Sequence, residues 1–272
     1  MRRRIWVIAD DYGFAPGIND AILALIEARR ISGTSCMTGF PTWQHDARSL
    51  KSCAEDAAIG LHLTLTDQPA VTGHSSLAPE GLLPSFARLA RASLLSAKDR
   101  LQVRAELDAQ YARFIDAFGR QPDFIDGHQH VHFLPVVRDW LRTSLTGAVR
   151  PWLRGAPAKA AAAAGTTAKI ATISAVALGF DTAMRGAGFT VMGPLAGIYD
   201  WRDPTGFPAA LEWATANLPD QGLFMCHPGN VDAVLAERDT MLDARPVEFQ
   251  TLLSERFAEQ LSEADISVAR AA

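Results

Sequence analysis

Near its start the chain reads Ile5-Trp-Val-Ile-Ala-Asp-Asp-Tyr-Gly13, in which five apolar residues run directly into two carboxylates. A short apolar run of this kind is typical of a strand buried in a parallel sheet. Carboxylates at the end of a buried strand are costly unless they are paired with a cation. The stretch therefore predicts a buried strand whose carboxyl end, at Asp10 and Asp11, carries a functional group.

Similar apolar runs recur along the chain, and most are followed by a pattern of helical spacing. The predicted strands are Ile5–Ala9, Thr34–Thr38, Ala58–Leu65, Asp123–Asp126, Ala148–Leu153, Phe189–Met192 and Gly222–Cys226. Helical spacing is found in Ile18, Ala21, Ile22, Leu25 and Ile26 and again in Leu107, Tyr111, Phe114, Ile115 and Phe118. Pro135 is expected to open another helix, and Pro246 one that runs through Val247, Phe249, Leu253 and Phe257.

Strands that alternate with helices imply parallel pairing through crossover helices. About seven such units in a chain of 272 residues favour a closed, distorted (β/α) barrel, similar to a TIM barrel, over an open doubly wound sheet. No GxGxxG motif follows the first strand, which argues against dinucleotide binding. We expect residues 1–272 to form a single α/β domain, with a long loop from about Gly73 to Leu95.

Residues that metals favour appear where the predicted strands end. In a parallel barrel the carboxyl ends of the strands meet on one face, where catalytic groups collect. Four strands would bring their polar residues to that face: Asp10 and Asp11 from the first, His62 from the third, Asp126, His128, His130 and His132 from the fourth, and His227 from the last. The sequence therefore predicts a metal or catalytic centre at one mouth of the barrel.

The run His128-Gln129-His130-Val131-His132 is the most specific of these signals. If the strand persisted through it, the period of two would place Asp126 and all three histidines on one face. Each signal also has a structural alternative: Asp10 and Asp11 could cap a helix, and His62 could be a hydrogen-bonded core histidine. The histidine run could be a solvated loop, and His227 could start a turn.

Composition excludes several classes of function. A net charge of −4 and a pI near 6.0 argue against a nucleic-acid partner. The basic cluster Arg2–Arg4 precedes an apolar run too short for a signal peptide. The cysteines Cys36, Cys53 and Cys226 suggest neither a disulfide framework nor a CxxC site, which fits a cytoplasmic location. The alanine-rich stretch Ala158–Phe180 is expected to form helices without an integral membrane segment, although it could pack on a membrane or in a homodimer.

At these residues the sequence closely resembles the ChbG/YdjC family of carbohydrate deacetylases. The matching segments are Ala9–Gly13 with Asn19, Gly33–Ser35, Gly60–Leu63, Glu106 and Gln110 before Gly119 and Pro122, Ile125–His132 and Met225–Gly229. The resemblance runs from residue 5 to about residue 230, with Tyr12 where the family usually has phenylalanine.

The resemblance implies a distorted (β/α) barrel, a divalent metal and hydrolysis of the N-acetyl group of an amino sugar. By motif position, the implied metal ligands are Asp11, His62 and His128. Zinc fits one carboxylate and two imidazoles best, and magnesium, which prefers oxygen ligands, is the alternative. Asp10 would be the general base, and His227, arriving from the opposite side of the barrel mouth, the general acid.

Other residues are candidates for supporting roles and for sugar binding. His130 and His132 could share the acid role or line the sugar pocket, and Asp126 could orient a ligand histidine. Arg150 and Arg154 could contact a phosphate or carboxylate on the substrate, or pair with local acidic groups. The aromatic candidates for the faces of sugar rings are Trp43, Trp152, Trp201 and Tyr199.

Three other interpretations remain open at this level. The first is a metal-dependent sugar isomerase or amidohydrolase on a similar barrel, which would not need the His227-Pro-Gly acid. The second is a non-catalytic sugar- or metal-binding protein on the same scaffold. The third is an enzyme that the alanine-rich stretch docks on a lipid-linked sugar. Free oligosaccharides, sugar phosphates and lipid-linked glycans all remain candidate substrates.

Overall fold

One parallel sheet runs through the computed structural model, which describes residues 2–91, 96–158 and 167–269. All the strand pairs of this sheet are parallel, as the alternation of strands and helices predicts. The described strands are β1 (Arg3–Tyr12), β2 (Gly33–Cys36), β3 (Ala58–Leu63), β4 (Phe124–Gly127), β5 (Trp152–Arg154), β6 (Val191–Met192), β7 (Leu195–Ala196), β8 (Leu223–Cys226) and β9 (Ile266–Val268).

The sheet closes into a barrel. Its strand order is β6-β5-β4-β3-β2-β1-β8-β7, so β6 and β7 stand at the two ends of the row. These two strands are consecutive in the chain and are separated only by Gly193 and Pro194. Pro157, just beyond β5, also bridges to Leu195 in β7. If β6 and β7 are counted as one interrupted strand, the ring has the seven strands predicted, and β9 pairs outside it with the start of β1.

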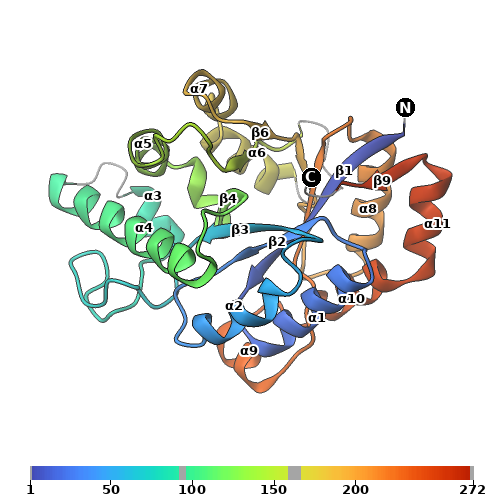
Figure 1. Ribbon diagram of the computed structural model, residues 1–272, viewed down its shortest axis with the longest axis horizontal. Coiled ribbons are helices and arrows are strands. Elements are labelled where there is room, and N and C mark those ends of the chain that lie inside the picture. Colours follow the sequence, from blue (N-terminus) through green and yellow to red (C-terminus); the bar gives the residue numbers. More distant parts are fainter. Residues whose placement is uncertain (1, 92–95, 159–166, 270–272) are drawn as a thin grey trace.

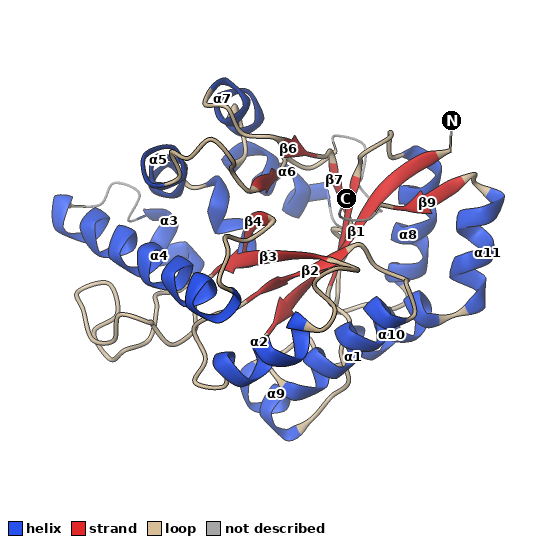
Figure 2. Cartoon of the chain, viewed as in Figure 1, coloured by secondary structure: helices blue, strands red, loops and turns tan. Residues whose placement is uncertain are grey.

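The helices surround this ring of strands, as Figures 1 and 2 show. The described helices are α1 (Pro16–Glu27), α2 (Trp43–Lys51), α3 (Phe86–Arg91), α4 (Ala97–Phe118), α5 (Pro135–Ser144), α6 (Thr167–Val176), α7 (Phe180–Gly186), α8 (Gly206–Asn217), α9 (Ala233–Arg238), α10 (Ala244–Leu253) and α11 (Glu255–Glu263). With the strands they form the distorted (β/α) barrel that the sequence predicts.

Most helix boundaries follow from local chemistry. Helices α1 and α5 begin at Pro16 and Pro135, where the missing N–H and fixed φ of proline suit the first turn. Helix α4 ends at Gly119, whose φ of 70° lies in the left-handed region. The helix predicted around Pro246 is in fact two helices, α10 and α11. The Ser254 hydroxyl separates them, because it caps α11 by accepting a hydrogen bond from the Phe257 N–H.

Two predicted segments differ in detail from the structure. The loop predicted from Gly73 to Leu95 contains helix α3, and its residues 92–95 lie outside the described part of the chain. The stretch Ala158–Phe180 contains α6 as expected, but its residues 159–166 are likewise outside the described part. Among the described residues, no helix is both long and apolar enough to cross a membrane.

Strands β2 and β3 approach too closely for any side chain at Gly33. A Cβ atom there would lie 2.0 Å from the backbone carbonyl oxygen of Ala58. A backbone oxygen in a paired strand cannot move aside without breaking the pairing. By contrast, a Cβ atom at Gly186, at the end of α7, would meet no atom within 4 Å.

We therefore predict that Gly33→Ala lowers the free energy of unfolding by about 1–3 kcal/mol, the usual cost of overpacking a core. The control Gly186→Ala should be neutral or stabilising by up to about 1 kcal/mol, because alanine favours helix over glycine. Thermal unfolding monitored by circular dichroism measures both. Equal melting temperatures for the two variants would show that β2 and β3 can separate at this point.

Candidate metal centre

The end of β1 directs its two carboxylates to different partners. The pairing of β1 with β2 is regular as far as Ala9, then shifts before Tyr12 pairs with Cys36. Within this irregularity Asp11 has a φ of 72°, in the left-handed region that aspartate tolerates better than most residues. Such bulges change the direction of a side chain next to a functional site. Asp10 and Asp11 are both buried, with exposed fractions of 2% and 1%.

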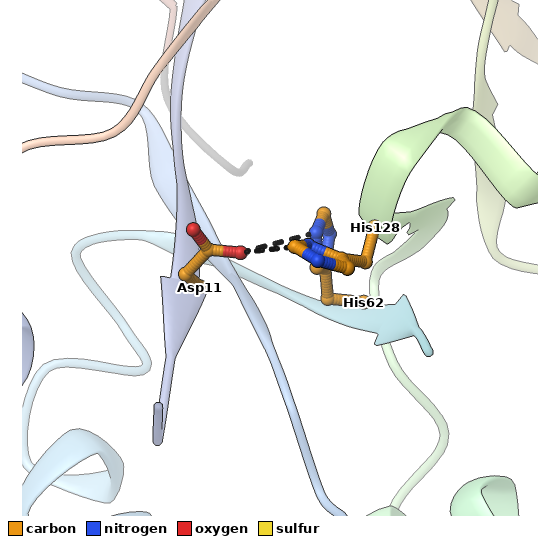
Figure 3. Close-up of side chains that lie close together, drawn as sticks. All are labelled: Asp11, His62 and His128. Carbon is orange, nitrogen blue, oxygen red and sulfur yellow. Dashed lines mark ion pairs between the residues drawn. The ribbon is translucent and has the colours of Figure 1, made fainter. Parts of the chain in front are cut away.

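Asp11 faces two imidazoles, those of His62 from β3 and His128 just after β4 (Figure 3). Its Oδ1 lies 3.4 Å from His62 Nε2 and 3.5 Å from His128 Nδ1. Two ligand atoms that each lie about 2.1 Å from one zinc ion in tetrahedral geometry are about 3.4 Å from each other. The Oδ1 atom is buried and accepts no hydrogen bond from the described residues. The three side chains could therefore hold a divalent metal ion.

His62 is oriented by a carboxylate behind it. Its Nδ1 lies 2.7 Å from Asp126 Oδ1 and 3.0 Å from Ser35 Oγ, which leaves Nε2 directed at Asp11. Burial lowers the pKa of His62, but the Asp126 and Asp10 carboxylates outweigh burial and raise this pKa to about 10. The same negative field that favours a proton on His62 also favours a metal cation. Asp126 thus contacts a candidate ligand histidine, and its orienting role stays a prediction.

Arg154 holds Asp10 and Asp126 together. Its Nη1 donates to Asp10 Oδ2 at 2.7 Å, its Nη2 donates to Asp10 Oδ1 at 2.5 Å, and Nη2 also contacts Asp126 Oδ2. Burial raises the pKa of Asp10, but the Arg154 guanidinium outweighs burial and holds this pKa at about 2. Arg154 is completely buried and does not line the cavity. The substrate-contact interpretation thus lacks geometric support, and the alternative, pairing with acidic groups, describes its contacts.

A second buried arginine, Arg245 of α10, was not predicted from the sequence. Its Nη2 donates to Asp11 Oδ2 and to Asp239 Oδ2, both at 2.7 Å. The pKa of Asp11, which burial alone would raise, lies well below its usual range because of this guanidinium. Arg245 therefore occupies one oxygen of Asp11 and leaves the other for the imidazoles. No local pattern near residue 245 signals this role, because the partner lies 234 residues earlier.

His227 lies beside Asp10 and not across the barrel mouth from it. Strand β8 pairs directly with β1, with Cys226 opposite Ala9, so the next residues of the two strands are also neighbours. His227 Nε2 is 3.9 Å from Asp10 Oδ2. The predicted approach from the opposite side is therefore wrong. Burial lowers the pKa of His227 to about 4, although the nearby Asp10 carboxylate acts to raise it. The imidazole is therefore neutral at pH 7.

A buried carboxyl group supports His227 from behind. Glu248 of α10 accepts hydrogen bonds from the His227 backbone N–H and, at 2.6 Å, from the Tyr199 hydroxyl. Burial raises the pKa of Glu248 to about 7, even though both hydrogen bonds favour the ionised form. Sequence reasoning named Tyr199 only as a candidate for sugar contact and missed Glu248.

The three histidines after β4 do not share one face. The strand ends at Gly127, and residues His128–Phe133 form an irregular 3₁₀ segment. Gln129 and His130 have φ values of 49° and 60°, so the strand does not persist and its period of two does not extend to the histidines. His128 therefore reaches Asp11 and His130 lines the cavity. His132 is buried against Phe133 and Phe180, does not line the cavity, and has a pKa well below its usual value because of burial.

A cavity of about 690 Å³ opens over the centre. Its lining includes Asp10, Asp11, His62, His128 and His227, which confirms that the strand ends converge. Of the four aromatic candidates for sugar contact, only Tyr199 and Trp201 line it. Trp43 is buried against Phe114, and Trp152 stacks on Phe124. Arg150 donates hydrogen bonds to the carbonyls of Gly147 and Ala187 and is not part of the lining.

Comparison with known proteins places these residues in a family context. The chain is 32% identical over 138 residues to a chitooligosaccharide deacetylase of Citrobacter koseri and 33% identical over 138 residues to one of Escherichia fergusonii. Each match covers 50% of this chain and 53% of the relative, so the chain spans about half the length of the curated relatives it matches.

A solved structure matches almost the whole chain. It is that of an Enterococcus faecalis V583 protein whose name proposes cellobiose-phosphate cleavage. It has a TM-score of 0.70 at 20% sequence identity and covers 99% of this chain and 98% of the other, which shows a shared fold. The YdjC-like protein family matches residues 4–263, which include all the candidate site residues. The chain belongs to the YdjC-like protein family.

Proposed function

We propose that this protein is a metal-dependent carbohydrate deacetylase that removes the acetyl group from an N-acetylated amino sugar. The observation that carries the proposal is the Asp11–His62–His128 cluster, with Asp10 and His227 beside it in one cavity. The names of the relatives from Citrobacter koseri and Escherichia fergusonii support the choice of reaction. A sugar isomerase or another amidohydrolase remains the alternative.

The proposed metal is zinc, held by Asp11, His62 and His128. One carboxylate and two imidazoles match zinc better than magnesium, which prefers a shell of oxygen atoms. When bound, such an ion polarises a carbonyl group and lowers the pKa of water. Arg245 would fix the ligand geometry, because it holds the second oxygen of Asp11.

Asp10 is the proposed general base. With its pKa held at about 2, it is ionised throughout the neutral range and can accept a hydrogen bond from the attacking water. Arg154 fixes the orientation of its carboxylate through two hydrogen bonds. A carboxylate held in this way loses little orientational freedom when the reaction begins.

His227 is the proposed carrier of the proton to the leaving amine. Because its pKa is about 4, the resting imidazole is neutral and must first gain a proton within the catalytic cycle. Its Nε2 lies 3.9 Å from Asp10 Oδ2. At this distance Asp10 can pass the proton that it takes from the attacking water to His227 through one bridging water molecule. Glu248 holds the backbone of His227 in place.

Three further parts of the interpretation stay predictions. These are a single domain over residues 1–272, a cytoplasmic location and packing of the alanine-rich stretch against a second copy of the chain.

Substrate contacts from His130 are compatible with its place in the cavity lining. For the buried His132 we propose a packing role against Phe133 instead.

Removal of the proposed metal should abolish activity. Protein stripped by a chelator should release no acetate from N-acetylated amino sugars, and zinc or cobalt should restore release more fully than magnesium. His62→Ala should lose the bound ion, whereas His45→Ala should retain it, because His45 lies on the surface with 75% of its side chain exposed. Metal content by mass spectrometry and acetate release measure the two effects. Full activity after stripping would contradict metal dependence.

A substitution at Asp10 distinguishes the proposed general base from the proposed metal ligands. Asp10→Asn should retain about the wild-type metal content while lowering kcat by ~10²–10⁴-fold, the usual scale for a general base. Asp116→Asn, on the exposed face of α4, is the matched control and should leave kcat unchanged. If Asp10→Asn keeps near-full activity, Asp10 is not the base. Isomerisation of a sugar by the wild-type protein without acetate release would instead favour the isomerase alternative.

A further inference from the structure

The cavity has an apolar wall beside the polar centre. Ile173 and Val176 of α6, Ile198 just after β7 and Met225 of β8 all line it. Ile198 and Met225 are buried in one hydrophobic cluster, and the half-buried Ile173 packs against that same cluster. We call these four residues the apolar wall.

The apolar wall lies on a different arc of the barrel from the metal ligands. Its members follow or belong to β5, β7 and β8, which are consecutive around the ring once β6 and β7 are counted together. The candidate ligands come from β1, β3 and β4. The cavity, at about 690 Å³, is within the range of about 300–1,000 Å³ typical of pockets that bury a whole small ligand. There is thus room beside the sugar for a second chemical group.

The described lining does not suit a phosphate as that second group. Its two arginines already have partners in the protein. Arg245 pairs with Asp11 and Asp239, and Arg238 donates to the Phe14 carbonyl and lies over the Phe40 ring. Recognition of a phosphate normally uses guanidinium or ammonium groups directed at the ligand.

The chemistry of the wall also does not suit a second sugar. Sugar rings present hydroxyl groups that require hydrogen-bonding partners, together with one apolar face that suits a flat aromatic surface. The apolar wall is branched aliphatic or thioether throughout, and Thr172 is the one polar residue among the described side chains of α6 that line the cavity. Aliphatic side chains and methionine bind flexible hydrocarbon by area alone.

We propose that the apolar wall is a subsite for a hydrocarbon group attached to the amino sugar, so that the preferred substrate is an N-acetylamino sugar glycosidically linked to an alkyl or isoprenoid chain. This inference rests on the proposed deacetylase function and specifies its substrate class. Acetate leaves the sugar nitrogen at the metal end, while the hydrocarbon group stays in the subsite and undergoes no reaction.

The test compares zinc-loaded protein on methyl, butyl and octyl N-acetyl-β-D-glucosaminide and on N,N′-diacetylchitobiose, with the octyl glycoside kept below its micelle concentration. Acetate release gives kcat/KM for each substrate. We expect kcat/KM to rise about 3- to 4-fold for each methylene that enters the cavity, and at least about 10-fold from methyl to octyl. Equal values for methyl and octyl, or a higher value for diacetylchitobiose than for octyl, would overturn the proposal.

Variants assign the effect to the wall. Ile173→Ser should reduce the octyl-to-methyl ratio of kcat/KM several-fold, and Val176→Ser, made in parallel, serves if the first variant fails to fold. The control Leu101→Ser changes a side chain on α4 that is 67% exposed and does not line the cavity, and it should leave the ratio unchanged. An unchanged ratio in folded Ile173→Ser and Val176→Ser contradicts the assignment.

A binding measurement separates failure of this inference from failure of the proposed function. Calorimetric titration with the free amines, octyl and methyl β-D-glucosaminide, requires no turnover. The octyl compound should bind at least about 10-fold more tightly, with the negative heat-capacity change of apolar burial. Equal affinities overturn the subsite even if acetate is released. Tight octyl binding without acetate release from any sugar refutes deacetylation and supports the subsite.

Discussion

The candidate centre depends on the placement of one guanidinium between two buried carboxylates. Asp10 and Asp126 are almost completely removed from water, and ionised carboxylates in such surroundings require a cation. Arg154 supplies it and is itself completely buried. Removing one member of such a group leaves a buried charge without a partner. The free-energy cost of that buried charge is far larger than the net stabilisation that the intact pair provides. The ends of β1, β4 and β5 are thus joined by charge as well as by the backbone hydrogen bonds of the sheet.

The register of the strands places the other site residues next to these carboxylates. His62 of β3 lies directly opposite Asp126 of β4, so its hydrogen bond to that carboxylate follows from the pairing itself. The pairing of β1 with β8 places His227 next to Asp10 in the same way. The irregular end of β1 then directs Asp11 away from Arg154 and toward the imidazoles. A one-residue slip in either pairing would separate these partners.

Much of this arrangement could be predicted from the sequence, because it depends on local patterns. Apolar runs located seven strands, and the polar residues at their ends located the centre. Strands β7 and β9 were not predicted, and their pairing with β8 and β1 depends on residues that are distant in the sequence. The strand predicted at Asp123–Asp126 does not persist through His132, because left-handed backbone at Gln129 and His130 ends the alternation. Arg245 and Glu248 could not be found, because their partners are distant in sequence.

The place of β1 in the ring bears on how the protein can be made by the ribosome. One edge of β1 pairs with β2, about 25 residues later, but the other edge pairs with β8, more than 200 residues later. During synthesis the nascent chain therefore carries an apolar strand with one open edge until nearly all of it has emerged, and such edges favour aggregation. Arg245, the counter-charge of Asp11, also emerges late. A polypeptide that stalls before β8 would expose this strand, which makes the growing chain a natural client for chaperones.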